Sequence, residues 1–75
     1  MGNYGYQCFK TKDRDVYCST KEFKNHDEGA AWVKLALAHF NIQAGDILGK
    51  PYTADSQPDG ATIWGPPNAA DVHNY

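Results

Sequence analysis

Cysteine and histidine are the residue types in this chain that could bind a metal ion or start nucleophilic chemistry. The sequence holds two cysteines, Cys8 and Cys18, and three histidines. Zinc-binding hairpins usually place a pair of thiolates about two to four residues apart, with a second ligand pair at a similarly short spacing. Here nine residues lie between the cysteines and twelve between His26 and His39. This spacing predicts no metal site.

Catalysis by either thiol would need a general base held beside it. No histidine stands at a short fixed spacing from Cys8 or Cys18, and the chain has no glycine-rich phosphate loop and no recognisable pair of catalytic carboxylates. The sequence therefore predicts no catalytic residues, no cofactor and no enzymatic activity.

The two cysteines have two alternative states. The first residues are neither basic nor apolar, so no secretory signal is expected, and a cytoplasmic location would keep both thiols free and buried. The alternative is a disulfide, which would suit a chain with so small a core. A three-residue loop centred on Asp13 would pair Cys8 with Cys18, whereas a four-residue loop over 12–15 would pair Cys8 with Ser19. The sequence does not choose between these loops.

Basic side chains gather in the amino-terminal third, interleaved with aromatic residues, and this mixture can contact phosphates and stack on bases. The strand end at 20–24, followed by an acid-capped helix with Ala31-Trp32, resembles the strand-to-helix junction of small DNA-binding domains such as those that precede phage integrases. Three acidic residues partly offset the cations, whereas strong nonspecific binders neutralise roughly six to ten phosphates. Nucleic-acid binding is therefore the alternative function, carried by Lys10, Lys12, Arg14, Lys21 and Lys24.

The final third of the chain contains all four prolines together with the aromatic residues Tyr52, Trp64 and Tyr75. Rigid aromatic side chains dominate the binding energy of protein interfaces, and a proline-flanked segment loses little entropy on binding. We therefore expect a noncatalytic protein-binding module, an accessory or inhibitory factor of the phage-encoded kind. Trp64 is either such an anchor or part of the core. The candidate binding residues are Tyr52, Trp64, Pro66, Pro67 and Tyr75.

The elements that must position these residues are a hairpin over 4–23 and a helix over 27–40. Asn25 or Asp27 is expected to cap the start of the helix. Residues 41–45 are expected to end the helix, with a positive φ at Gly45. A third strand is expected over 61–64, followed by a loose tail over 68–75. Apolar spacing predicts a core of Phe9, Val16, Trp32, Val33, Ala36, Leu37, Phe40 and Ile47.

Length and composition limit the chain to one small α+β domain. Seventy-five residues are too few for two cores, and no apolar run approaches the roughly 18 residues of a membrane span. The net charge of −2 combines a basic amino-terminal third with an acidic remainder. The sequence is also compatible with a homodimer, because the unpaired edge of a hairpin can pair with a second copy of the chain.

Overall fold

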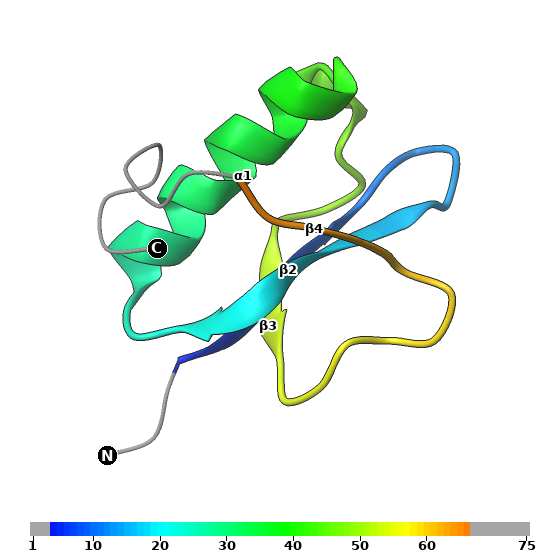
Figure 1. Ribbon diagram of the computed structural model, residues 1–75. Helices are drawn as coiled ribbons and strands as arrows, with labels where there is room; N and C mark the ends of the chain where they lie inside the picture. Colours follow the sequence, from blue (N-terminus) through cyan, green and yellow to red (C-terminus); the bar gives the residue numbers. More distant parts are fainter. Residues whose placement is uncertain (1–3, 67–75) are drawn as a thin grey trace.

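A single helix lies across one face of a four-stranded sheet in the computed structural model, which describes residues 4–66 (Figure 1). The strand order is β3-β1-β2-β4. This is the α+β domain that the sequence predicts, with four strands rather than two or three. The elements along the chain are β1 (Gly5–Lys10), β2 (Val16–Phe23), α1 (His26–Phe40), a 3₁₀ turn η1 (Ala44–Asp46), β3 (Tyr52–Ala54) and β4 (Thr62–Trp64).

The central hairpin of β1 and β2 has a three-residue loop, not a four-residue one. Cys8 pairs with Cys18 and Phe9 with Tyr17. The Thr11 N–H donates to the Asp15 carbonyl at 2.9 Å, which leaves residues 12–14 as the loop. Arg14 has φ 70°. A left-handed residue at the end of a three-residue loop matches the twist of the two strands, so the local backbone selects this register.

The two outer strands pair with residues far away in the sequence. β3 runs antiparallel to β1, with Gln7 opposite Thr53, and β4 runs parallel to β2, with Cys18 opposite Ile63. The expected strand over 61–64 is therefore present, and β3 is an addition. Three residues after a proline are too few to show an alternating pattern, so β3 is formed by its pairing rather than by its own propensity.

Helix α1 has a reciprocal cap at its start. Oδ1 of Asn25 accepts from the Glu28 N–H at 3.0 Å, and Oε1 of Glu28 accepts from the Lys24 N–H at 3.3 Å. The helix ends at Phe40, and the left-handed backbone of the next residue, Asn41 (φ 58°), lets the Ile42 N–H reach the Leu37 carbonyl at 2.9 Å. The expectation that Gly45 has a positive φ is wrong, because asparagine adopts this conformation earlier and Gly45 lies in η1.

The core lies between α1 and the hairpin. One predicted core residue, Val16, needs correction, and one core residue, Phe23, was not predicted. The register places Val16 opposite Lys10, on the sheet face away from α1, so Val16 is only half-buried. Phe23, at the end of β2, is fully buried in its stead. The buried cluster consists of Phe9, Phe23, Trp32, Val33 and Ala36, with Leu37, Phe40 and Ile47 packed against it.

Candidate functional site

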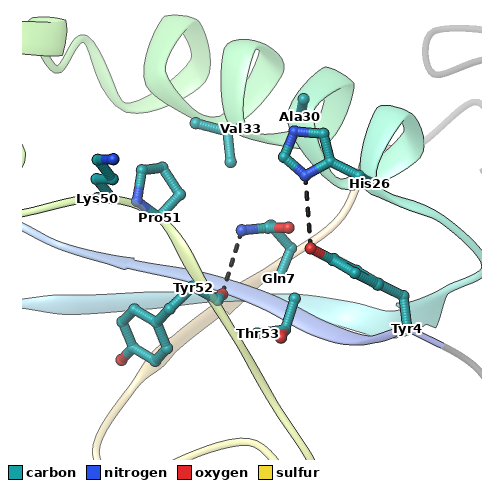
Figure 2. A pocket seen from close by; sticks show the side chains of 9 residues that line it. All are labelled: Tyr4, Gln7, His26, Ala30, Val33, Lys50, Pro51, Tyr52 and Thr53. Carbon is teal, nitrogen blue, oxygen red and sulfur yellow. Dashed lines mark hydrogen bonds between the residues drawn. The ribbon is translucent and has the colours of Figure 1, made fainter.

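A groove of about 330 Å³ runs between α1 and the edge strand β3, with β1 beneath it (Figure 2). The helix supplies one wall through Ala30 and Val33, and the segment from Lys50 to Thr53 supplies the other. Its lining residues are Tyr4, Gln7, His26, Ala30, Val33, Lys50, Pro51, Tyr52 and Thr53.

Gln7 forms the floor of the groove and ties its walls together. This side chain is only 5% exposed, and its Nε2 donates to the Tyr52 carbonyl at 3.1 Å (Figure 2). Its Oε1 lies against the Cα of Gly29, where a Cβ on residue 29 would overlap it. The helix therefore approaches the sheet this closely only because residue 29 has no side chain.

The two ends of the groove differ in chemistry. At one end the hydroxyl of Tyr4 and Nδ1 of His26 are 3.5 Å apart, with their rings edge to face. At the other end lies Lys50, the one formally charged side chain among the lining residues. Gly49, with φ +76°, turns the chain there between the bridge at Ile47 and the start of β3. The groove is thus basic at its Lys50 end.

The outer edge of β3 presents backbone groups toward solvent. Cys8 and Cys18 have Cα atoms 4.2 Å apart, the spacing of a pair without mutual backbone hydrogen bonds. The N–H and C=O of Cys8 therefore point toward β3, where Tyr52 is its partner. Successive residues of a strand point their N–H and C=O groups toward opposite edges. The N–H and C=O of Thr53, the residue after Tyr52, therefore point away from β1. Thr53 accordingly offers a donor and an acceptor beside the groove.

Three of the five residues predicted to bind protein lie within residues 4–66, and the structure does not bring these three together. Tyr52 lines the groove through its backbone carbonyl, and its side chain, on a residue that is 40% exposed, points away from α1 (Figure 2). Trp64 is half-buried, stacks on His39 with ring centroids 4.5 Å apart, and accepts at its carbonyl a 3.0 Å hydrogen bond from Trp32 Nε1. Pro66 is half-buried two residues later. Pro67 and Tyr75, like the predicted tail over 68–75, lie outside the described residues.

The five basic residues predicted to bind nucleic acid are spread along the whole hairpin. Lys12 and Arg14 are exposed at its loop, Lys10 is half-buried in β1, and Lys21 and Lys24 lie at the opposite end of β2 or just after it. The aromatic residues between them are not all accessible. Phe9 is fully buried, so its ring is closed to a base, and Tyr17 is half-buried and stacks on Phe9 with ring centroids 5.0 Å apart.

Cys8 and Cys18 are joined in a disulfide and are both fully buried. The structure thus has a disulfide where the sequence favoured free thiols, because the three-residue loop places the two residues directly opposite each other. Their sulfurs are neither thiolate ligands nor nucleophiles in this state. Among residues 4–66, no three histidine, cysteine, aspartate or glutamate side chains gather as a metal site would require.

Sequence reasoning missed most of the groove. Gln7, Lys50 and Thr53 lie on separate segments that only sheet pairing brings together. One local signal was present: the turn at Gly49 and Pro51, directly before Tyr52, marks a chain reversal that can deliver an edge strand.

Two further findings concern the whole described region. Among residues 4–66, no helix has both the length and the apolar character to cross a bilayer. Comparison with protein-family models, with curated proteins and with solved structures found no match for this chain.

Proposed function

We propose that this protein is a noncatalytic protein-binding module that acts by direct contact, as an accessory or inhibitory factor. The observation that carries the proposal is the groove between α1 and β3, which combines an apolar wall with an open strand edge. Exposed grooves with aromatic and aliphatic linings are where a few anchor side chains provide most of the binding energy. Tyr4, with 45% of its surface exposed, is an aromatic side chain of this site, and Tyr52, which the sequence singles out, reaches the groove through its backbone carbonyl.

The chemistry of the groove also supports binding rather than turnover. Its titratable side chains are Tyr4, His26, Lys50 and Tyr52. His26 is 3.5 Å from the Tyr4 hydroxyl, and among the lining residues it faces neither a carboxylate nor a thiol. A general base needs a nucleophile or substrate proton within hydrogen-bond distance. This set offers hydrogen bonds, one positive charge and apolar contact, which are the means of recognition.

The location of the protein stays a prediction. The sequence favours the cytoplasm, whereas a buried disulfide is typical of oxidising compartments. Alkylation of free thiols in intact source cells, followed by mass spectrometry, measures which state Cys8 and Cys18 have there. The phage origin also stays a prediction from the size of the chain.

Capture with matched helix variants tests the proposal. The purified chain is immobilised, exposed to source-cell lysate with and without nuclease, and the retained proteins are identified by mass spectrometry. Ala30→Gln narrows the groove, and Ala38→Gln is its control, because both alanines are exposed on α1 and only Ala30 lines the groove. Glutamine is a good helix former without charge, so both variants should fold equally well.

We expect a protein that survives nuclease, is retained by Ala38→Gln and is lost or much reduced with Ala30→Gln. A partner retained equally by both variants would contradict a binding function for the groove. Material that disappears with nuclease, and that is lost when Lys12 and Arg14 are changed to Glu, would establish nucleic-acid binding through the hairpin in its place.

A further inference from the structure

We propose that the outer edge of β3, beside the groove, binds an extended peptide segment of a partner protein as an added antiparallel strand, with an acidic residue at the Lys50 end. This inference rests on the proposed function and names the chemistry of the partner. It follows from three features of the site: the direction of the β3 backbone, the face on which Thr53 lies, and the charges at the two ends.

The first feature is the backbone of Thr53, whose N–H and C=O point away from β1. A peptide residue opposite Thr53 can donate its N–H to that carbonyl and accept from that N–H, forming the close pair of an antiparallel ladder. Pro51, two residues earlier, has no backbone N–H. An edge strand with open groups of this kind is a template for another chain.

The second feature is the side on which the peptide's side chains would lie. Thr53 pairs with Gln7, and both line the groove, so both side chains face α1. Residues directly opposite each other in a ladder project to the same face. The peptide residue opposite Thr53 therefore lies on the α1 face of the sheet, at the margin of the groove that Ala30 and Val33 line. Its natural complement is a small or branched apolar side chain.

The third feature sets the direction of the peptide. Lys50 precedes β3 at one end of the groove, and Asp55 follows β3 at the other, where Tyr4 also lies. Both charged residues are exposed. We number the peptide from its apolar residue, which lies opposite Thr53. In an antiparallel pair, the peptide residue two positions later lies near Lys50, and the peptide residue two positions earlier lies near Asp55. Complementary charges are thus acidic after and basic before the apolar residue.

Three related peptides test this arrangement on the full-length chain. The first is acetyl-Lys-Thr-Val-Thr-Glu-amide, the second has Lys and Glu exchanged, and the third is the first with the valine nitrogen methylated. Each is titrated into ¹⁵N-labelled protein while the amide signals of Ala30, Val33 and Thr53 are followed by NMR. Surface charge pairs contribute little each, so exchange of both charges should weaken binding roughly fivefold. Methylation removes a ladder donor and blocks the edge, and should weaken binding roughly tenfold or more.

Two protein variants assign these effects to the named residues. Lys50→Ala should reduce the preference between the first two peptides, and Lys34→Ala, an exposed lysine on α1 outside the groove, should leave it unchanged. Thr53→Pro removes the outward N–H without removing a bond to β1, so it should abolish peptide binding. Its melting temperature and its amide spectrum away from β3 report whether the fold is kept, and Thr53 N-methylation by peptide semisynthesis gives a second route if it is not.

Each outcome decides the inference. Equal or tighter binding of the charge-exchanged peptide overturns the direction, and tight binding of the methylated peptide overturns strand addition. Sedimentation measures whether the protein forms a dimer. A dimer that is lost in Thr53→Pro would show that the edge of β3 binds a second copy of this chain and not a partner peptide. If no peptide binds at millimolar concentration, the inference of strand addition is wrong. The proposed function still stands in that case if a captured partner binds Ala38→Gln but not Ala30→Gln. If no partner makes that distinction, the proposed function fails as well.

Discussion

Gln7 shows how much of this site depends on a single buried amide. Its backbone N–H donates to Ser19 Oγ at 3.1 Å, its side-chain Nε2 donates to the Tyr52 carbonyl, and its Oε1 fills the space beside Gly29. A buried polar group without partners costs free energy, so the hydrogen bond to Tyr52 and the contact with Gly29 hold the side chain in one position. Gln7 thereby sets the separation of α1 from β3, which is the width of the groove.

Gly29→Ala tests this contact. Alanine in a helix stabilises by up to about 1 kcal/mol relative to glycine, whereas displacement of the Gln7 amide from its hydrogen bond costs about 1–3 kcal/mol. We expect a net loss of about 1–2 kcal/mol in the free energy of unfolding, measured by urea denaturation. In a Gln7→Ala background the obstacle is gone, so the same substitution should stabilise the protein. A loss of equal size in both backgrounds would contradict the proposed overlap.

At the scale of single elements, α1 is the best specified part of the chain because its start and end both have local signals. The Asn25 and Glu28 side chains satisfy backbone donors at one end, and Asn41 satisfies carbonyls at the other. The cap also places His26 at the first helical position, next to Tyr4 at the end of the groove.

Asn25→Ala removes the side-chain acceptor for the Glu28 N–H. We expect a loss of about 1 kcal/mol in the free energy of unfolding, visible as a lower urea midpoint with an unchanged slope. Asn25→Asp is the matched control, because aspartate accepts the same bond and should retain most of the stability. If alanine and aspartate behave alike, the cap does not contribute as described.

The two tryptophans lie at different depths of the interface between α1 and the sheet. Trp32 is fully buried and Trp64 half-buried, with ring centroids 6.4 Å apart. We expect Trp32→Ala to cost about 3–5 kcal/mol and to unfold most of the protein, and Trp64→Ala to cost about 2 kcal/mol. Circular dichroism with thermal melting measures both. If Trp64→Ala leaves the melting temperature unchanged, Trp64 is a surface anchor rather than a support for the core.

At the scale of the whole molecule, the buried apolar cluster is small and the disulfide supplements it. The five side chains of that cluster all lie between α1 and the hairpin, whereas Cys8 and Cys18 lie in register between Tyr52 and Ile63 on the other face of the sheet. The disulfide thus links the two central strands on the face that the helix does not cover. Chains of this length commonly need such a crosslink.

Reduction of the disulfide should destabilise the protein without removing the fold class. Closing a loop with a sequence separation of 10 restricts the unfolded chain and contributes about 2–3 kcal/mol. Urea denaturation with and without a reductant measures this difference. The Cys8→Ala, Cys18→Ala double variant should be insensitive to reductant and about as stable as the reduced protein. Equal stability of oxidised and reduced protein would contradict the contribution of the crosslink.

The parts of the fold that could be predicted are those whose signals lie within a few residues. The helix over 27–40 is confirmed to within one residue at its start, since apolar spacing and capping residues act locally. The hairpin follows from its extended-chain residues and a polar loop, but its register and the role of Val16 do not, because either loop length satisfied the same pattern.

Local sequence by itself determined one helix, one hairpin and a short strand near the end, because helix periodicity, caps and turns act between neighbours in the chain. Tertiary structure decided the groove. The hydrogen bond from Gln7 to Tyr52 joins residues 45 positions apart, and β3 gains its strand conformation only by pairing with β1. Such pairings depend on the packing of the whole domain, and no pattern of neighbouring residues encodes them.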